Sequence, residues 1–544
     1  MDKDITEKEL LNATKTLKNK KAFGEDSISN EMIKNSINHL TPALLKLFNN
    51  ILMTECFPRQ WSEGLILPIY KAGDPLDPSN YRGITISNCI GKLFTKILNI
   101  RLLEFLTTNK LINIFQIGFM PKNRTADHIL VLKTIIDTFK KKRKTLYICF
   151  VDLKKAFDTV HRASLIYKLQ EMKISTKFTN IISDMYSHLT AKIKMKNGIT
   201  ENFPIQIGTR QGCNLSPSLF NIYMNDLPNI FDTKCNPISL NNTSIPCLMY
   251  ADDLVIFSEK QEGLFTCLKR LETYCKKWRL SINTQKTKII IVNKKKNVTY
   301  NFQINNNTIE ITNNHNYLGI IISSNGSFKP AIEELYQKAS RAYFSLRQSF
   351  NFQENTQPKT LIKLFQSMIQ PILLYNAEIW GAFIWPKNTR RAISHSFTNI
   401  KHKFETLHTK LCKNALGVHK KSSDIMVMAE LGRYPLMSNI IKHIYTYWQH
   451  ILHARDNLLH KTLEYLILSD RLGHVNYYSR IKALFFMLNQ SHLIYQCDHK
   501  QIKTYSNTIK NAYNKLYNEH FFKTLEEKAN RENSGGIYMS LTIM

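Results

Sequence analysis

The chain has 544 residues, of which 74 are Lys or Arg and 42 are Asp or Glu, so its formal net charge is +32. With 43% hydrophobic residues it is a globular chain and not a disordered one, and so large a positive charge requires an extended anionic partner. The ten cysteines form no CxxC pair and no apolar stretch is long enough to span a bilayer. We therefore expect a reducing compartment, no secretion, no membrane insertion, and nucleic acid as the partner.

Helical and strand patterns alternate through the first 145 residues. Residues 1–60 are predicted to form two or three short helices, and the Gly- and Pro-rich residues 71–82 a loop between strands. Apolar residues recur at spacings of three and four over 90–106 and 127–139, which predicts two helices. The five cations 140–144 follow, and they form either a contact to a nucleic-acid backbone or a solvated loop.

The alternation continues to about residue 330. Residues 146–151 are a short apolar run that predicts a buried strand ending at Asp152, and residues 247–257 have two apolar arms around a polar centre, which is typical of a hairpin. Further expected elements are helices over 162–172, 216–225 and 261–278 and a strand over 288–292. Beyond residue 330 the pattern is helical, and it includes one apolar face over 440–452.

Two acidic sites stand at the ends of these apolar strands. Asp152 ends one strand, with Asp158 six residues on, and Asp252 and Asp253 occupy the hairpin centre. An Asp pair alone is usually an exposed turn, but apolar flanks on both sides and a second strand-end Asp favour a cluster that needs cations. Two divalent ions about 3.5 to 4 Å apart serve in-line phosphoryl transfer. Mg²⁺ suits such oxygen ligands, with Mn²⁺ as a possible substitute.

These residues resemble motifs of the reverse transcriptases of non-LTR (LINE-type, jockey-like) retrotransposons. Tyr250-Ala-Asp-Asp253 resembles the family's YxDD box, Phe150-Val-Asp-Leu-Lys-Lys-Ala-Phe-Asp158 its FxDxxxAFD box, and Gly208-Thr-Arg-Gln-Gly-Cys-Asn-Leu-Ser-Pro-Ser-Leu-Phe-Asn221 its RQGxxLSPxLFN segment. The remaining matches occur in family order: Gly24 to Asn30, Asn80 to Ile84, Gln116 to Phe119 with Arg124, Thr125 and Asp127, Ile282-Asn283 with Lys286 to Lys288, and Tyr317-Leu-Gly319. The resemblance covers residues 20–330 closely and 330–440 more loosely.

The resemblance implies roles for the acidic residues and their neighbours. Asp152, Asp252 and Asp253 would hold two Mg²⁺ ions, and the carbonyl of Leu153 would add a ligand. Phe157 would be the bulky residue that clashes with a 2′-hydroxyl and so favours deoxynucleotides. Without the neighbouring motif, Phe157 would be read as a core residue.

The resemblance also implies residues that contact the incoming nucleotide. Gln211 and Gly212 would reach it through an amide and a close backbone approach, and Tyr250 would join them. Lys71 and Arg82 would clamp the triphosphate from either side of the Gly- and Pro-rich loop. Taken singly, each of these is also an ordinary turn residue or a solvated cation.

Proton transfer and nucleic-acid contact complete the implied roles. Lys286 is the candidate to protonate pyrophosphate, with Lys288 as its rival and a surface strand-edge lysine as the alternative. Tyr317, Leu318 and Gly319 would form a hairpin that grips the primer end, and Arg124 would contact nucleic acid.

Other features of the sequence limit the function. The histidines at 443, 450 and 453 have no nearby Cys and only the last pair shares a helix face, so a zinc site is not expected. About 60 residues precede the predicted fingers, far short of the nuclease domain that full-length members carry. We therefore expect the chain not to cut DNA by itself, with the endonuclease separate or missing and the chain a fragment or a truncated element.

The predicted fold is α/β (α+β), a right-hand polymerase whose palm carries an antiparallel catalytic sheet. Its expected parts are an N-terminal helical extension (1–60), fingers (61–148), a palm with interleaved fingers elements (149–325, giving a reverse transcriptase domain of about 60–325), a helical thumb (326–440) and a basic helical C-terminal region (441–544). The predicted function is RNA-directed DNA synthesis from dNTPs on an RNA template with a DNA primer. Two alternatives stay open: an inactive remnant that acts as an RNA-binding or splicing cofactor, and an RNA-dependent RNA polymerase. The family's life cycle implies a ribonucleoprotein of nucleus and cytoplasm, and the oligomeric state is left open.

Overall fold

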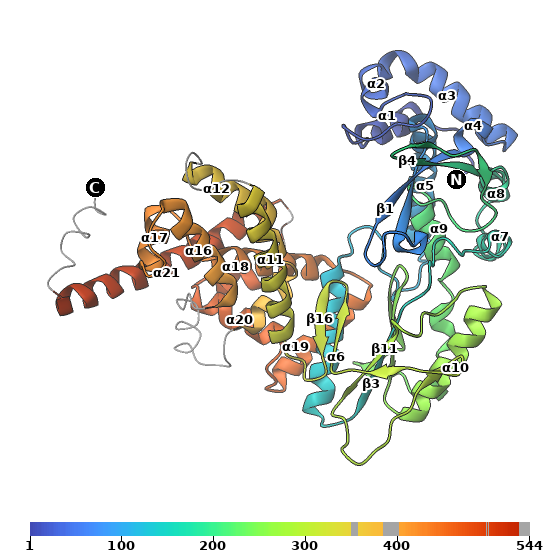
Figure 1. Ribbon diagram of the computed structural model, residues 1–544. Coiled ribbons are helices and arrows are strands. Elements are labelled where there is room, and N and C mark those ends of the chain that lie inside the picture. The colour runs from blue at the N-terminus through green and yellow to red at the C-terminus, as the bar shows by residue number, and fades with distance from the viewer. Residues whose placement is uncertain (350–356, 385–401, 497, 499, 533–544) are drawn as a thin grey trace.

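The computed structural model describes residues 1–349, 357–384, 402–496, 498 and 500–532. Mixed helices and strands fill the chain up to β16 (Ile320–Ser323), and the described residues after it are helical or connect helices. Figure 1 shows the mixed half on the right and the helical half on the left, with α6 (Thr125–Lys141) and β16 between them. The mixed α/β composition and the helical second half that the sequence predicts are confirmed.

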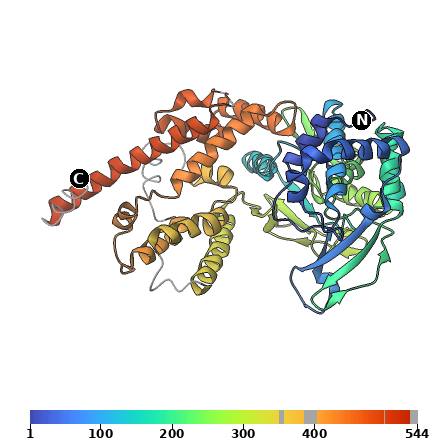
Figure 2. The ribbon, with the colours of Figure 1, turned by 90° about the horizontal axis from the view of Figure 1, so that it is seen from above.

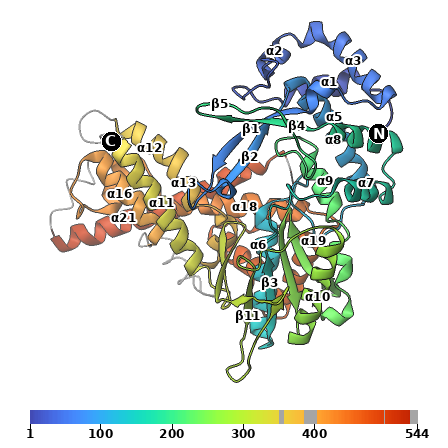
Figure 3. The same ribbon diagram turned by 45° about the vertical axis from the view of Figure 1, so that its right-hand side comes forward.

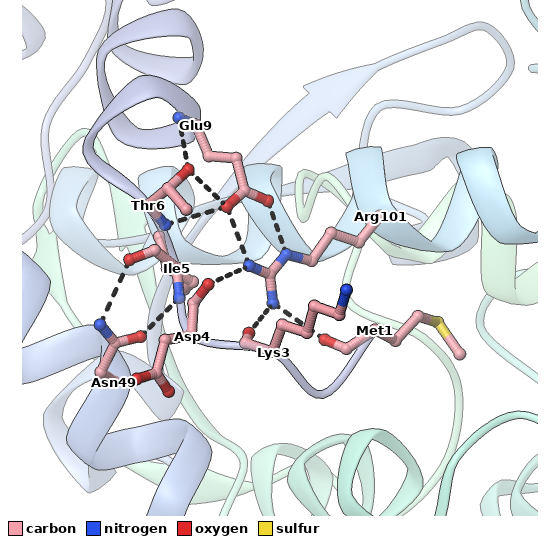
Figure 4. Close-up of polar contacts among 8 residues, drawn as sticks. All are labelled: Met1, Lys3, Asp4, Ile5, Thr6, Glu9, Asn49 and Arg101. Carbon is pink, nitrogen blue, oxygen red and sulfur yellow. Dashed lines mark hydrogen bonds and ion pairs between the residues drawn. The ribbon is translucent and has the colours of Figure 1, made fainter.

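Four helices, and not two or three, form the N-terminal part: α1 (Glu7–Lys15), α2 (Asn30–Asn35), α3 (Ile37–Thr54) and α4 (Arg59–Ser62). Thr6 caps α1, because its hydroxyl accepts a hydrogen bond from the Glu9 amide while the Glu9 carboxylate accepts one from the Thr6 amide. Arg101, on α5 (Cys89–Thr108), donates to the Glu9 carboxylate. Figure 4 shows that it also reaches three backbone carbonyls of the first four residues, so α5 anchors this segment.

The first sheet carries the Gly- and Pro-rich loop. Its strands are β1 (Glu63–Tyr70), β2 (Tyr81–Ile86), β4 (Thr190–Met195), β5 (Gly198–Ile199) and β6 (Phe203–Pro204). β1 pairs antiparallel with β2 and parallel with β4, so the loop between β1 and β2 lies between strands as predicted. Figure 3 shows β1 and β2 as a blue hairpin that projects away from the N-terminal helices.

The second sheet contains both acidic sites. Its order is β14 (Glu310–Ile311), β11 (Lys288–Val292), β3 (Leu146–Val151), β10 (Asp253–Ser258) and β9 (Cys247–Tyr250). β3 pairs antiparallel with both β10 and β11, and every residue of β3 is buried, as its continuous apolar run predicts. The helix α10 (Gln261–Lys277) packs against β10, and α6 packs against β11.

The remaining elements connect the sheets or build the helical half. Up to β16 the other helices and strands are α7 (Arg162–Glu171), α8 (Thr176–Ser187), α9 (Ser216–Tyr223) and the short strands β7 (Ile238–Leu240), β8 (Thr243–Ile245), β12 (Gln303–Ile304), β13 (Asn307–Thr308) and β15 (Asn314–Tyr317). The helical half contains α11 (Lys329–Ser349), α12 (Pro358–Leu364), a π-helical turn (Phe365–Ile369), α13 (Gln370–Leu373), α14 (Ala377–Trp380), α16 (Lys403–Leu416), α17 (Asp424–Glu430), α18 (Met437–His453), α19 (Leu458–Arg471), α20 (Tyr477–Met487) and α21 (Ile502–Glu532).

The helix α6 joins the two halves. Its spacing predicts one apolar face, yet nearly all of its side chains from Ala126 to Phe139 are buried. The reason is that α14 and α19 cover the faces that the sheet leaves open, and Figure 2 shows the cyan helix between the two halves. Its polar residues are therefore paired inside the protein: Asp127 accepts from Tyr447 Oη and contacts His450 Nε2, both at 3.0 Å.

Two further predictions concern the cysteines and membrane-spanning helices. The nine cysteines within the described residues are free, and Cys497 lies outside those residues. Within the same part of the chain, no helix combines the length and apolar character needed to cross a membrane.

Candidate active site

The three predicted carboxylates lie at one edge of the second sheet, where β3 ends and where β9 turns into β10. Val151 at the end of β3 is paired with Leu254 of β10, so Asp152 follows β3 at the edge where the β9–β10 hairpin turns. In that turn, Asp253 pairs with Tyr250, and Ala251 and Asp252 lie between them. The structure therefore brings Asp152 next to the hairpin turn, although a hundred residues separate them in sequence.

The three carboxylates act on one another through their charges. Burial, then the charges of Asp252 and Asp152, raise the pKa of Asp253 to about 6. Burial also raises the pKa of Asp252, and the charge of Asp152 adds to this effect. The charges of Arg82 and Lys71 act in the opposite direction on Asp252. The acidic cluster thus repels itself, and these two cations offset part of the repulsion.

The donor chemistry of the cluster fits a hard divalent cation. Carboxylate oxygens are the ligands that Mg²⁺ takes, and a cation between them would relieve the repulsion that raises the pKa of Asp252 and Asp253. Among the residues that the structure describes, no three His, Cys, Asp or Glu side chains lie close enough together to enclose a metal ion.

A cavity of about 350 Å³ opens beside the carboxylates. Asp152 and Asp253 line it, together with Lys286 and Lys288, which precede and begin β11. Lys288 Nζ lies 2.6 Å from the Glu310 carboxylate, whereas the Lys286 side chain is exposed. The cavity therefore presents one cation already paired within the protein and one directed to solvent.

The predicted nucleotide contacts lie in the segment that follows β3 and in the segment that precedes α9. The Phe157 ring stacks on Phe220 with the ring centroids 4.4 Å apart. Gln211 Nε2 donates to the Asp158 carboxylate at 2.5 Å. Gly212 has a φ of +110°, and a Cβ there would lie 2.5 Å from the Thr85 carbonyl oxygen, so this close approach to β2 requires glycine.

The predicted triphosphate contacts lie on the β1–β2 hairpin. Arg82 is paired with Ile69 in the ladder, and the Lys71 amide donates to the Asn80 carbonyl. Both cationic side chains are exposed. The charges of both lower the pKa of Asp252, so both lie within electrostatic reach of that carboxylate.

The predicted nucleic-acid contacts lie between the two halves of the protein. Leu318 and Gly319 both have positive φ and join β15 to β16 in a two-residue turn of type I′ geometry. Tyr375 Oη donates to the Leu318 carbonyl at 3.0 Å. Tyr317, the last residue of β15, is buried, and its hydroxyl lies 3.2 Å from Nδ1 of His128.

Arg124 is placed apart from the carboxylates. It lines a second cavity, of about 480 Å³, together with Tyr375, Lys442 and His443. Because Tyr375 also contacts Leu318, this cavity adjoins the β15–β16 hairpin.

The structure adds residues to which the sequence assigned no role. The hydroxyl of Thr287, which is fully buried, accepts from the Asp152 amide at 3.3 Å. Gln116 and Asn221 are also buried and hydrogen-bonded near the hairpin turn. All three stand in motif blocks. For Gln116 and Asn221 the signal that could have found them is a polar side chain between apolar neighbours, whereas Thr287 lies among polar residues and gives no such signal.

The comparisons with known proteins cover this site. Residues 69–322 match the family described as reverse transcriptase (RNA-dependent DNA polymerase). The probable RNA-directed DNA polymerase from transposon BS of Drosophila melanogaster is 26% identical over 391 residues, which are 70% of this chain and 42% of that protein. The Pol polyprotein from the type-1 retrotransposable element R2 of Popillia japonica is 30% identical over 288 residues, 51% of this chain and 40% of that protein. Among solved structures, apo telomerase from Candida tropicalis covers 87% of this chain and 74% of its own, with a TM-score of 0.40 and 12% identity.

Each sequence match covers only part of the relative. The chain spans about two fifths of the length of the curated relatives it matches. The matched residues 69–322 include both acidic sites, the loop between β1 and β2 with β2 itself, and the turn at Leu318.

Proposed function

We propose that this chain, which carries a LINE-type reverse transcriptase domain over residues 69–322, is an RNA-directed DNA polymerase that acts through two metal ions. The observation that carries the proposal is the convergence of Asp152, Asp252 and Asp253 at one edge of the second sheet, where burial and the neighbouring carboxylate charges raise the pKa of Asp252 and Asp253. A cluster of this kind is useful when cations and a polyanionic substrate neutralise it.

The proposed architecture is a right hand built from the described elements. Residues 61–148 would serve as fingers, 149–325 as the palm and 326–440 as the thumb, after an N-terminal extension and before a basic C-terminal region. The antiparallel pairing of β3, β9 and β10 supports the assignment of the palm.

The carboxylates would hold two Mg²⁺ ions, with the Leu153 carbonyl as a further ligand. Such ions stabilise both the attacking 3′-oxygen of the primer and the leaving pyrophosphate. Pairing of the chain on either side of Leu153, from the Asn283 amide to the Asp152 carbonyl and from the Lys154 amide to the Ser281 carbonyl, holds this backbone in place.

The cations around the carboxylates would bind and protonate the triphosphate. Lys71 and Arg82 lie on the β1–β2 hairpin with their charges acting on Asp252, so a triphosphate beside Asp252 would lie within their field. Lys286, exposed on the rim of the 350 Å³ cavity, would donate a proton to the departing pyrophosphate. The ion pair of Lys288 with Glu310 favours Lys286 over Lys288 for this step.

The choice of nucleotide would rest on the residues between Asp152 and the β1–β2 hairpin. Phe157, whose ring is held by Phe220, would clash with a 2′-hydroxyl and so select dNTPs. Gln211, Gly212 and Tyr250 would contact the incoming nucleotide and the template base that pairs with it.

The nucleic acid would pass between the mixed half and the helical half. The Tyr317-Leu318-Gly319 turn would hold the DNA primer end, and Arg124 would contact the backbone. The RNA template would be recognised through its A-form shape and its 2′-hydroxyls more than through sequence. The net charge of +32 supplies the attraction for phosphates.

The test compares four reactions of the purified chain with Mg²⁺ and a DNA primer: RNA or DNA template, each with dNTPs or with rNTPs. We expect extension with dNTPs on the RNA template. Extension with rNTPs alone would assign the chain to RNA-dependent RNA polymerases. Tight binding of the primer–template without extension in any reaction would assign it to RNA-binding proteins.

A further inference from the structure

The backbone of the hairpin turn has a feature that its own sequence does not explain. Ala251, between Tyr250 and Asp252, has a φ of +57°, a conformation that residues with a Cβ rarely adopt. Such a conformation persists only where surrounding groups hold it. Ala251 is also buried, so its amide and its carbonyl both need partners within the protein.

One side chain supplies both partners. Oε1 of Gln116 accepts from the Ala251 amide at 3.0 Å, and Nε2 of Gln116 donates to the Ala251 carbonyl at 3.3 Å. The same Oε1 accepts from the Gly118 amide at 2.9 Å, which orients the amide group. Gln116 is only 2% exposed, so these bonds are not shared with bulk water.

The backbone around Gln116 is docked on the same hairpin. The Met249 amide, on β9, donates to the Phe115 carbonyl at 2.8 Å, and the Ile117 amide donates to the Met249 carbonyl at 3.0 Å. Gln116 is therefore bridged to Met249, two residues before Ala251. The loop between α5 and α6 thus pairs with β9 and places the Gln116 side chain under the turn.

Gly118 and Asn221 hold this loop close to the turn. A Cβ at Gly118 would lie 2.2 Å from the Ala251 amide nitrogen, so a side chain there would displace the turn. Nδ2 of Asn221, on α9, donates to the Gly118 carbonyl at 2.7 Å, and Asn221 is 1% exposed. Two segments far from Ala251 in sequence therefore support the turn: the loop at 116–118 directly, and α9 through Gly118.

We infer that Gln116, Gly118 and Asn221 form a turn bracket that holds Ala251 in its left-handed conformation and thereby positions Asp252 and Asp253. Gln116 is the central positioning residue, because its carboxamide offers at once the acceptor and the donor that the two backbone groups of Ala251 require. A leucine there would leave both groups buried without partners, and an ionised glutamate would restore only the acceptor. This inference rests on the proposed function, since it concerns the geometry of the same carboxylates.

The test uses full-length Gln116→Leu, Gln116→Glu and Gly118→Ala variants beside the parent. Gln449→Leu is the matched control, because Gln449 is a 1% exposed glutamine whose Nε2 donates to a backbone carbonyl, that of Gln496, far along the chain. Four quantities are measured: kcat and KM for dNTP, the Kd for primer–template, Mn²⁺ binding by electron paramagnetic resonance, and thermal unfolding. Mn²⁺ binding reports on the carboxylates without turnover.

We expect Gln116→Leu and Gly118→Ala to lower kcat about 10- to 100-fold and to weaken Mn²⁺ binding by a similar factor, as loss of the groups that orient metal ligands does. KM for dNTP, measured at saturating metal, and the Kd for primer–template should stay within about twofold of the parent, because the bracket is inferred to act on the carboxylates and not on either substrate. The kcat and Mn²⁺ affinity of Gln116→Glu should lie between those of Gln116→Leu and the parent. The kcat and Mn²⁺ affinity of Gln449→Leu should equal those of the parent.

Parent-like kcat and Mn²⁺ binding in folded Gln116→Leu would overturn the inference, as would equal losses in Gln449→Leu. If Gln116→Leu does not fold, the same two quantities in Gln116→Glu decide, and parent-like values overturn the inference. If the parent does not extend a primer, the proposed function fails, whereas the Mn²⁺ comparison still decides whether the bracket positions the carboxylates.

Discussion

At the scale of single residues, the neighbours of Phe157 restrict its ring. Phe220 stacks on one side of it, and Phe119 meets it edge-on with the ring centroids 6.0 Å apart. A ring held on two sides cannot move aside for a larger sugar at low cost. This restriction gives the proposed selection against ribonucleotides a physical basis.

Phe157→Ala should therefore raise ribonucleotide use. We expect kcat/KM for rNTP relative to dNTP to increase about tenfold or more, because a pocket that excludes by shape discriminates at this level. The measurement is single-nucleotide incorporation on an RNA template. The control is Phe265→Ala. Phe265 lies on α10 and its ring packs against Phe302, so its removal should leave the ratio unchanged. An unchanged ratio in Phe157→Ala would make Phe157 a core residue only.

The two lysines beside Asp152 can also be separated. Lys286→Leu should lower kcat about 100-fold or more by removing the proton donor. Lys288→Leu should have a much smaller effect, because Lys288 is paired with Glu310. Single-turnover incorporation rates for both variants make the comparison. A larger loss in Lys288→Leu would reverse the assignment.

At the scale of elements, the local sequence pattern predicted the bounds of single helices and strands better than their packing against distant parts of the chain. The apolar run 146–151 became β3 with the expected bounds, because a strand buried on both faces needs no polar alternation. The apolar face predicted for 127–139 became a helix buried nearly all round, since α14 and α19 pack on it from more than 230 positions further along the chain. Neither that packing nor the parallel pairing of β1 with β4 is visible in local spacing.

The N-terminal helix α1 is anchored by the side chain of Arg101 through Glu9, and this contact can be tested. Hydrogen bonds from Arg101, opposed by burial and assisted by Thr6, lower the pKa of Glu9 from 4.5 to about 2. Because the pKa is lower in the folded state, this contribution to stability is fully present above about pH 4.5 and is lost as the pH falls toward 2.

Glu9→Gln should therefore destabilise α1 in a pH-dependent way. We expect a loss of about 1 kcal/mol near pH 6, discounted for the partly exposed carboxylate, and a shrinking difference from the parent as the pH falls below 4.5. Hydrogen exchange of the α1 amides in parent and variant measures it. A difference that stays constant from pH 6 to pH 3 would mean that the Glu9 charge does not hold the segment.

At the scale of the whole molecule, the site joins segments from the entire chain. The sequence placed Asp152 correctly at the end of a strand and the Asp252–Asp253 pair at the turn of a hairpin, because apolar runs flank both sites. It gave no sign that Asp127 of α6 would contact Tyr447 and His450, more than 300 residues away. It also gave no sign that Gln116 would reach Ala251. Contacts of this kind depend on the completed fold.

The most direct test is primer extension by the parent and by the Asp252→Asn, Asp253→Asn double variant, on one RNA template with Mg²⁺ and dNTPs. Primer–template binding is measured in the same samples. We predict that the parent extends the primer and that the double variant binds the duplex with similar affinity and does not extend it, because the cations have lost two ligands. Extension by the double variant would contradict the assignment of Asp252 and Asp253 as the metal-binding carboxylates.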